Sequence, residues 1–561
     1  MEKHWEILNK TVVRTRSTIA TRVGRDSQES VVETLLKNRK IKDREVFFNP
    51  PAPGYLVTQL PSYLPDLDLE GLHKAVERIK RAITSKEKIV IWGDYDVDGV
   101  CATAILWQAI TDLGGEVLPY IPDRFTEGYG LNRQGIEKLV SQGTNLMLTV
   151  DTGVVAYEEI EFAHSLGLDV IVTDHHLKSD RSLSAYAIVH TTNLCGAGVA
   201  WVLASQLNNQ IRLPDGQATE SLNNHLDLVA IATIADIQSL LGANRSLVRA
   251  GLEILNKAQR PGIAALTRVA SLKLGEIGSW GVGWVLAPRI NAIGRMEKGI
   301  EALRLLLTKN EVEAGGLAHK LDEANVRRHA LTVDTLEHAK TMVVDGEIIV
   351  VYDDSWHEGI IGLVAGRLVE EYGRPAVVIA KGEKISRGSA RSVNGINIVE
   401  LLRSIPSDLL VDVGGHEAAA GFTLATDKLE QFVSSLKEKS TGIFKNQDMR
   451  PLLKIDCVLP LDKVDLELLE KIARFEPFGI GNPEPVFLAE QALVIKEERV
   501  GKEKQHLKLR LSPSFEALWF GRGDQPPFSP GEEVDLVYTP KIDRFNGRKK
   551  ITLRVHDLRR K

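Results

Sequence analysis

The most informative stretch of the sequence is residues 88–99, KIVIWGDYDVDG, in which an apolar run leads directly into three alternating carboxylates. The run at 88–92 predicts a short buried strand, and the small and apolar residues at 99–113 predict a helix after it. Asp94, Asp96 and Asp98 therefore lie where a strand turns into a helix.

The same alternation continues along the chain. Short apolar runs separated by amphipathic stretches are typical of βαβ units and a parallel sheet, so we expect an α/β fold. The further strands are expected at 117–121, 146–150 and 170–173, and the further helices at 133–142 and 156–166.

Acidic and imidazole side chains follow two more of these strands. Asp151 comes directly after 146–150, and Asp174, His175 and His176 come after 170–173. The carboxyl ends of parallel strands meet at one edge of a sheet, where ligands bind. Asp236, which closes a later apolar run, could add another carboxylate to the same crevice.

Mixed carboxylate and imidazole groups favour Mn²⁺ or Mg²⁺, and so many carboxylates suit two ions better than one. Two such ions promote displacement at phosphorus, which indicates hydrolysis of a phosphate ester or a phosphoanhydride. An isolated acidic cluster is more often a solvated turn, but three strand ends carrying ligand groups favour a metal site. An EF-hand is excluded because its twelfth position, Ile105, is apolar. An ATP motor is unsupported, since no GxxxxGK[ST] sequence occurs.

The rest of the chain divides by pattern. Residues 1–55 form a lead-in, 56–245 the catalytic α/β domain and 246–345 a helical connector. A second α/β domain follows at 346–445, with strands at 348–352 and 376–380 around a helix at 359–372. Four short apolar runs in residues 450–561 predict a small β-barrel, with strands at 506–511, 515–520, 534–538 and 551–555.

Three further patches contain groups suited to phosphate. Arg124 lies in a loop after a strand, and Ser389 and Arg391 lie in the segment GSARS. His416 lies in GGHEAAAG, a glycine-rich turn expected before a small-residue helix. Each patch alone is as compatible with a structural role as with a functional one.

Composition is that of an ordinary globular protein, with 43% hydrophobic and 26% charged residues and a net charge of −5. The three cysteines form no CxxC pair, and no signal peptide or membrane span is evident, so we expect a cytoplasmic protein without a membrane partner. Residues 541–561 hold nine basic residues against two acidic ones, which fits either a nucleic-acid surface or a plain solvated face.

These motifs together resemble the DHH phosphoesterase superfamily, named for the triplet found here at Asp174-His175-His176. Within it, the chain is similar to the RecJ family of single-strand-specific exonucleases from about residue 50 to its end. The matching motifs, in the family's order, are GDYDVDG (93–99), EGYG (127–130), WHEGIIG (356–362), GSARS (388–392), GGHEAAAG (414–421) and FGIGNPEP (478–485).

The resemblance implies a DHH domain, a long linking helix, a DHHA1 domain and a C-terminal OB-fold. It also implies two-metal hydrolysis of single-stranded DNA from the 5′ end to mononucleotides, in DNA repair and recombination. RNA as a second substrate, a single-strand-binding protein and a helicase as partners, and a monomeric state are further expectations.

Roles for individual residues also come from the resemblance. The implied ligands of two Mn²⁺ or Mg²⁺ ions are Asp94, Asp96, Asp98, Asp151, His175 and Asp236. His176 is expected to stabilise the scissile phosphate or protonate the leaving oxygen, with Asp98 and Asp151 beside it in catalysis. The implied substrate contacts are Arg124, Arg289, Arg295, Ser389, Arg391 and His416, of which Arg124, Ser389 and Arg391 would grip the 5′-phosphate.

Three alternatives stay open. Smaller DHH phosphodiesterases act on short RNA or cyclic dinucleotides, but they lack the barrel-like tail, which suits a polymer. A non-catalytic nucleic-acid-binding relative would have lost its ligands, which are intact here. A small-molecule pyrophosphatase would need neither Arg391, nor the connector, nor the tail.

Overall fold

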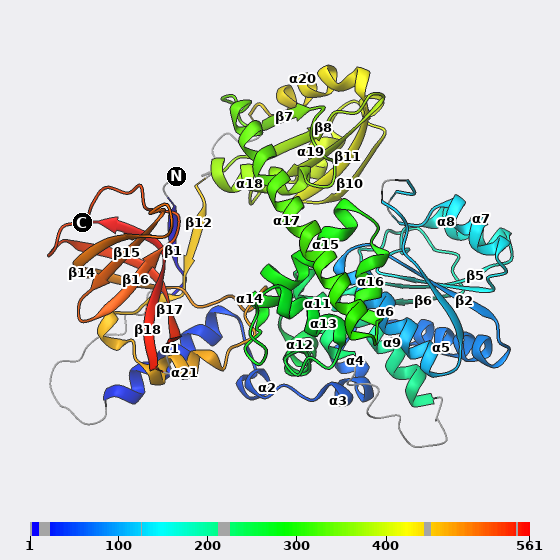
Figure 1. Ribbon diagram of the computed structural model, residues 1–561, viewed down its shortest axis with the longest axis horizontal. Helices are drawn as coiled ribbons and strands as arrows, with labels where there is room; N and C mark the ends of the chain where they lie inside the picture. The colour runs from blue at the N-terminus through cyan, green and yellow to red at the C-terminus, as the bar shows by residue number, and fades with distance from the viewer. Residues whose placement is uncertain are drawn as a thin grey trace. The chain divides into compact units, whose positions relative to one another are not determined.

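The computed structural model describes residues 3–9, 23–124, 126–128, 130–210, 225–442, 450–545 and 548–561. It divides into two compact units, which are described separately (Figure 1). The first holds residues 52–238 and 246–450, and the second holds residues 2–51, 239–245 and 451–561.

The catalytic domain is built on a five-stranded, entirely parallel sheet. Its strands are β2 (Lys88–Gly93), β3 (Glu116–Tyr120), β4 (Leu146–Val150), β5 (Asp169–Asp174) and β6 (Ala187–His190), in the order β3-β2-β4-β5-β6. The chain moves to one side of β2 for β3 and to the other side for β4, so β2 and β4 flank the topological switch point. The expected parallel sheet is thus confirmed.

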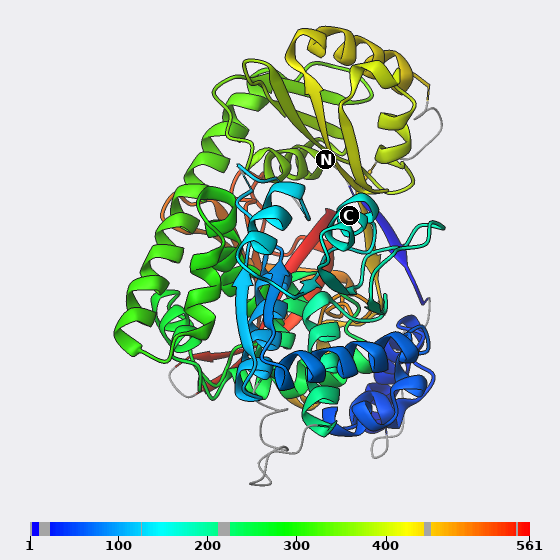
Figure 2. The same ribbon diagram turned by 90° about the vertical axis from the view of Figure 1, so that its right-hand side faces the viewer.

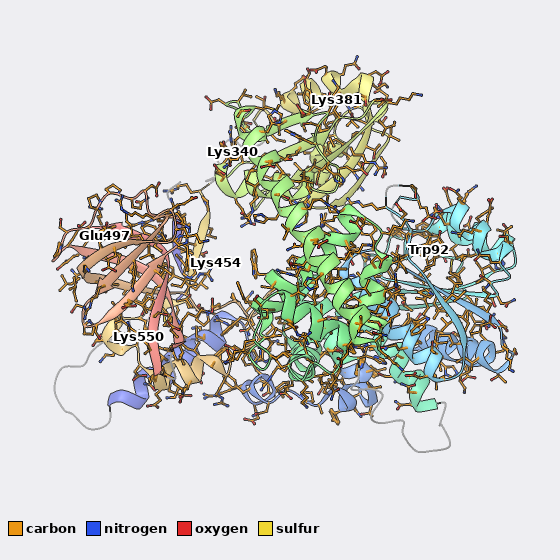
Figure 3. All side chains as sticks on the ribbon, in the orientation of Figure 1. Trp92, Lys340, Lys381, Lys454, Glu497 and Lys550 are labelled. Carbon is orange, nitrogen blue, oxygen red and sulfur yellow. The ribbon has the colours of Figure 1, made fainter. Side chains whose placement is uncertain are left out.

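Helices cover both faces of this sheet (Figures 1 and 2). On one face, α7 (Arg133–Ser141) and α8 (Tyr157–Ser165) pack on a core that includes Trp92 of β2, labelled in Figure 3. The other face is covered by α5 (Leu69–Thr84), α6 (Val97–Asp112) and α9 (Gly196–Gln210). Burial on both faces explains why the strands are apolar runs without polar alternation.

The connector is helical, as expected from its pattern. Its helices include α12 (Gly242–Leu255), α13 (Pro261–Val269), α15 (Ala287–Met296) and α16 (Ile300–Leu307), whereas α11 (Leu226–Ala235), directly before Asp236, lies within the range 56–245 of the catalytic domain. The longest helix, α17 (Glu311–Thr341), begins at Asn310, whose side chain accepts hydrogen bonds from the amides of Val312 and Glu313. Its first half buries an apolar stripe at Leu317, Leu321 and Ala324, whereas residues 325–334 contain no buried side chain.

The DHHA1-like domain has a mixed sheet in the order β10-β11-β9-β8-β7. Its elements are β7 (Ile349–Asp353), α18 (Ile361–Tyr372), β8 (Ala376–Ala380), β9 (Ile385–Arg391), α19 (Ile398–Arg403), β10 (Asp412–His416), β11 (Ala419–Ala425) and α20 (Leu429–Ser440). The small-residue helix expected after the GGH turn was wrong, because the alanines at 419 and 420 open β11. Pairing of β11 with both β9 and β10 outweighs the helix propensity of alanine there.

The C-terminal strands form a closed barrel. They are β14 (Phe487–Val500), β15 (His506–Leu511), β16 (Phe515–Trp519), β17 (Glu533–Phe545) and β18 (Arg548–Arg560), and Figure 3 labels Glu497 on β14 and Lys550 on β18. Strand order β14-β15-β16-β18-β17 closes through an additional β14–β17 pairing, with β16 and β18 parallel. This arrangement is a Greek-key barrel of the OB type, which confirms the expected tail.

Residues 2–51, set apart by sequence as a lead-in, belong to the same unit as the barrel. Strand β1 (His4–Ile7) pairs in parallel with β12 (Leu452–Ile455), and side chains of α1 (Val23–Asn38) and α2 (Arg44–Phe48) share one apolar core with the barrel. Among the helices of the described ranges, none combines the length and apolar character of a membrane span.

The buried side chain of Arg245 connects distant segments of this second unit through hydrogen bonds. Its guanidinium donates to the carbonyls of Phe47 (2.7 Å), Phe475 (2.9 Å) and Glu476 (3.0 Å), and it stacks 3.9 Å from the Phe47 ring. The residue is only 1% exposed. The Phe475 carbonyl also accepts from Asn482 Nδ2 at 2.6 Å, whereas for the carbonyls of Phe47 and Glu476 the guanidinium is the donor found among the described residues.

We predict that Arg245→Met destabilises the second unit by roughly 3 kcal/mol, because the carbonyls of Phe47 and Glu476 lose the guanidinium that donates to them. Native-state hydrogen exchange of the amides in β14 and β17 measures this loss. Arg44→Met is the control, since Arg44 is half-exposed and its surface ion pairs are worth at most about 1 kcal/mol. Equal protection in the two variants would contradict the role of Arg245.

Candidate metal centre

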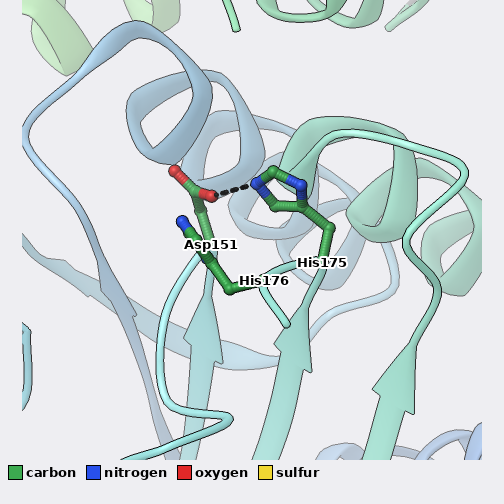
Figure 4. Close-up of side chains that lie close together, drawn as sticks. All are labelled: Asp151, His175 and His176. Carbon is green, nitrogen blue, oxygen red and sulfur yellow. Dashed lines mark hydrogen bonds and ion pairs between the residues drawn. The ribbon is translucent and has the colours of Figure 1, made fainter. Parts of the chain in front are cut away.

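Three neighbouring strands deliver polar side chains to one edge of the catalytic sheet. Gly93, Val150 and Thr173 are paired across β2, β4 and β5, so the residues that follow them, Asp94, Asp151 and Asp174, leave the sheet at the same level. Figure 4 shows Asp151 and His175 above the ends of these strands, with a hydrogen bond between their side chains. The structure therefore brings together the groups that the sequence placed at strand ends.

The start of α6 adds two carboxylates. Asp96 is its N-cap and accepts hydrogen bonds from the amides of Asp98 (2.9 Å) and Gly99 (3.1 Å). Asp98 accepts from the first amides of α9, those of Gly196 (2.6 Å) and Ala197 (2.7 Å). The positive end of the α9 dipole thus faces a buried carboxylate and holds it in place.

Asp151 has a left-handed backbone with φ of +58°. Aspartate tolerates this region better than most residues, and the Asp151 amide still donates to the carbonyl of Thr173 at 3.0 Å. A Cβ on Gly196 would lie 2.6 Å from the Cβ of Asp151, so only glycine lets the start of α9 approach this closely.

The clustered groups form three sets whose ligand atoms lie within 4.8 Å of one another. These sets are Asp94, Asp96 and Asp151; Asp98, His175 and Asp236; and Asp151, His175 and His176. His175 Nε2 lies 3.0 Å from Asp151, 3.6 Å from Asp98 and 3.7 Å from Asp236. Asp151 and His175 thus connect the first two sets, and the oxygen-rich donors with one imidazole fit a pair of Mn²⁺ or Mg²⁺ ions.

Electrostatics indicate that this cluster needs a cation. Burial raises the pKa of Asp94 to about 8, and the nearby charge of Asp96 adds to the shift. Burial, together with the charges of Asp236 and Asp96, raises the pKa of Asp98 to about 7. Burial and the Asp98 charge also raise the pKa of Asp151 well above its usual range. Like charges enclosed together are costly, and divalent cations relieve that cost.

The two adjacent histidines have opposite pKa shifts. A hydrogen bond of 2.7 Å from Nδ1 to Asp174 raises the pKa of His176 to about 9, so this imidazole is cationic at neutral pH. Burial lowers the pKa of His175, which leaves a neutral ring suited to metal ligation. Asp174 itself is fixed by the amides of Val154 (2.9 Å) and His175 (2.7 Å).

Two expected substrate residues lie beside the carboxylates. The Arg124 guanidinium lies 5.2 Å from the centre of the Tyr95 ring. Arg295 is half-buried and donates to the carbonyl of Gly359 at 3.3 Å, which links the connector to the segment before α18. Burial, followed by the charge of Arg124, lowers the pKa of Arg295 to about 10, so it stays cationic at neutral pH.

The remaining expected contacts are distributed differently. Arg391 lies on β9 and donates to Ser389 Oγ at 3.0 Å, so these two groups form one patch beside Gly362 of α18. Arg289 is paired with Asp322 of α17 at 2.8 Å. His416 is exposed at the end of β10.

Sequence reasoning missed supporting residues. Asp174 was not expected to act, although it orients His176. Gln238 donates to Asp236 at 2.8 Å and lies 3.3 Å from Nδ1 of His175, and Asn291 accepts from the amide of Val97 at 3.0 Å. The only available signal was proximity in sequence to expected ligands, which does not distinguish an orienting group from a neighbour.

Comparisons with known proteins agree with this architecture. Residues 88–233 match the DHH family N-terminal domain, 345–441 match the DHHA1 domain, and 455–557 match the RecJ OB domain. Among curated relatives, the chain is similar to the single-stranded-DNA-specific exonucleases RecJ of Bacillus subtilis and Escherichia coli. Identity is 36% over 522 residues for the first and 31% over 538 residues for the second.

Coverage differs between these relatives. The B. subtilis alignment covers 90% of this chain but 65% of the relative, whereas the E. coli alignment covers 88% and 91%. The crystal structure of Thermus thermophilus RecJ in complex with Mn²⁺ matches with a TM-score of 0.83 and 28% identity, covering 99% of this chain and 79% of that one. A second crystal structure of that protein is a complex with Mg²⁺.

The domain matches follow the order of the domains in the fold. The E. coli relative is more than 30% identical, and this chain covers nine-tenths of its length. The chain belongs to the RecJ family of single-stranded-DNA-specific exonucleases.

Proposed function

We propose that this protein hydrolyses single-stranded DNA from the 5′ end to mononucleotides, using two divalent cations, in DNA repair and recombination. The observation that carries the proposal is the pair of ligand sets joined by Asp151 and His175 at one sheet edge. The OB-type barrel supports a polymeric substrate, because such barrels bind single strands through stacking and cationic grooves.

The ions would be held by Asp94, Asp96, Asp98, Asp151, His175 and Asp236, and when bound they activate water and neutralise phosphoryl charge. Residues of the protein position these ligands and the scissile phosphate. The amides of α9 fix Asp98, and His175 is kept neutral by burial. Cationic His176, held by Asp174, is available to stabilise the scissile phosphate and to give a proton to the leaving oxygen.

Polarity would come from the 5′-phosphate. Arg391 and Ser389 form one patch, and Arg391 has no ion pair with a described residue, so its guanidinium can bind an anion bidentately. Arg124, beside Tyr95, would approach the same phosphate from the catalytic domain. Exposed His416 is proposed as a further contact from the DHHA1 side.

Finer aspects of the proposal rest on the family resemblance. They are a monomeric state, a cytoplasmic location, RNA as a second substrate, and a single-strand-binding protein and a helicase as partners. The smaller DHH phosphodiesterases and non-catalytic relatives become outcomes of the test that follows.

We expect 5′-phosphorylated single-stranded DNA, labelled at its 3′ end, to shorten from the 5′ end in the presence of Mn²⁺. Duplex DNA should persist. Asp98→Ala and His175→Ala should each lower the rate by on the order of a thousandfold, because each removes a ligand and leaves like charges without compensation. Product ladders on a denaturing gel measure both rate and polarity.

Asp112→Ala is the matched control for Asp98→Ala, since Asp112 ends the same helix and is exposed. It should cleave at the wild-type rate. Hydrolysis of short RNA or cyclic dinucleotides without cleavage of DNA would move the protein to the smaller DHH phosphodiesterases. Binding without hydrolysis would make it a non-catalytic relative.

Asp174→Asn should shift the alkaline limb of the pH profile of kcat/KM to lower pH by about one unit or more. In the wild type, the Asp174 carboxylate holds the pKa of His176 at about 9, so the cation is lost only above that pH. An asparagine keeps the shape but not the charge, and the cation is then lost earlier as pH rises. An unshifted limb would show that His176 is not the titrating group.

Mn²⁺ should raise the melting temperature more at about pH 8 than at about pH 6. The raised pKa values of Asp94 and Asp98 mean that the metal-free folded state holds protons that the unfolded state releases, so its stability falls as pH rises from about 4 to about 8. Binding of the cation displaces those protons and restores the stability that the metal-free protein loses at higher pH. Asp98→Asn should reduce the pH dependence of the rise in melting temperature caused by Mn²⁺. An equal rise at both pH values in the wild type would contradict this prediction.

A further inference from the structure

Arg124 lies in the segment between β3 and α7, where two reciprocal hydrogen bonds close a turn around it. The amide of Glu127 donates to the carbonyl of Asp123 at 2.8 Å, and the amide of Asp123 donates to Glu127 Oε2 at 2.7 Å. Arg124 directly follows Asp123 within this turn. The turn therefore sets the direction in which the Arg124 side chain leaves the backbone.

The second oxygen of the Glu127 carboxylate anchors this turn to the catalytic sheet. Glu127 Oε1 accepts a hydrogen bond from the hydroxyl of Tyr120, the last residue of β3. Burial, together with the hydrogen bond to Glu127, raises the pKa of the Tyr120 phenol well above its usual value, so the hydroxyl keeps its proton and remains a donor. One carboxylate thus joins the backbone of the turn to the end of a strand.

Tyr120 is itself fixed relative to the metal centre. It is paired in register with Trp92 of β2, and the centroids of the two rings lie 4.5 Å apart. The Trp92 side chain is fully buried, and Asp94 follows it after one glycine. The hydrogen bonds of Glu127 therefore connect Arg124 to the strand that delivers the first carboxylate of the centre.

The same hydrogen bonds direct the Arg124 cation away from Glu127. A carboxylate this close in sequence could neutralise the guanidinium, but both oxygens of Glu127 accept from other donors. The guanidinium instead faces the Tyr95 ring, 5.2 Å from its centre. Burial raises the pKa of Tyr95 to about 12, and the adjacent Arg124 cation opposes that rise. Arg124 is thus directed toward the residues around the metal centre.

We propose that Glu127, together with Tyr120, is a positioning residue that holds the Arg124 guanidinium where the 5′-terminal phosphate binds. The inference rests on the proposed function, in which Arg124 contacts that phosphate, and it adds the side chains that set the place of this contact. A charge-assisted contact to phosphate depends on the positions of the donor nitrogens. A loose turn would therefore weaken the contact even though the charge of Arg124 is unchanged.

Positioning and simple electrostatics predict opposite effects when the Glu127 charge is removed. A carboxylate near a bound phosphate repels it, so its removal alone would strengthen the preference for a 5′-phosphate. Loss of positioning would weaken that preference. Glu127→Gln separates the two effects, because its Oε1 can still accept from the Asp123 amide while its Nε2–H donates to the hydroxyl oxygen of Tyr120.

The test compares the Kd values of two oligothymidines, labelled at the 3′ end, that differ only in carrying a 5′-phosphate or a 5′-hydroxyl. Binding is measured in EDTA at a fixed salt concentration. We expect Glu127→Ala to lower the preference for the 5′-phosphate by on the order of tenfold, and Tyr120→Phe to lower it by about threefold. Binding of the 5′-hydroxyl strand should stay at the wild-type level. Glu127→Gln should keep most of the wild-type preference.

Further variants supply the reference values. Arg124→Ala should lose the preference, and the double variant of Arg124→Ala and Glu127→Ala should match it, because Glu127 acts only through Arg124. Glu116→Ala is the matched control for the lost charge, since Glu116 is exposed at the opposite end of β3. It should show the wild-type preference.

Specific outcomes would overturn the inference. An unchanged or stronger preference for the 5′-phosphate in Glu127→Ala, when Arg124→Ala loses it, would exclude the positioning role and leave the exonuclease proposal intact. An equal loss for both oligothymidines would do the same, because it indicates a general defect of the fold. An Arg124→Ala variant that keeps the wild-type preference would overturn the role of Arg124 and this inference with it. A wild-type protein that does not cleave single-stranded DNA would instead overturn the proposed function.

Discussion

The common register of β2, β4 and β5 is the constraint on which the catalytic domain depends. Because Gly93, Val150 and Thr173 are level with one another, the next residue of each strand emerges at the same sheet edge. Carboxylates are thereby enclosed at distances where their charges repel. Several neighbouring groups offset that repulsion, namely the amides at the start of α9, the cationic His176 and Arg295 on α15.

The adjacent histidines show how the environment, more than residue type, sets chemistry at this edge. Both rings belong to one DHH triplet. His175 faces three carboxylates of the candidate metal centre, whereas His176 faces the carboxylate of Asp174, which already accepts hydrogen bonds from backbone amides. One imidazole is therefore kept neutral and the other charged. A neutral ligand and a cationic partner for phosphate are obtained from two consecutive residues.

The sequence predicted that these acidic and imidazole side chains lie together, but it did not predict the residues around them, for a physical reason. Asp94, Asp151 and His175 follow apolar runs of strand length, and parallel topology converts that local pattern into proximity. Strand β14 was not expected, since its segment AEQALVIKEERV is rich in helix formers and its pairing partners lie far away in sequence. The pairing of Arg289 with Asp322 and the orienting role of Gln238 likewise depend on helix packing, which no local pattern encodes.

The association of the first 51 residues with the barrel has a consequence for biosynthesis. Strand β1 pairs with β12, which follows some four hundred and fifty residues later in the sequence. Arg245 likewise donates to the carbonyls of Phe475 and Glu476, which are synthesised long after it. A ribosome delivers the N-terminal segment first, so its apolar helices remain without their core while the catalytic domain emerges and folds. The barrel unit is therefore completed last, and the apolar side chains of α1 and α2 lack their packing partners until residues 451–561 have been synthesised.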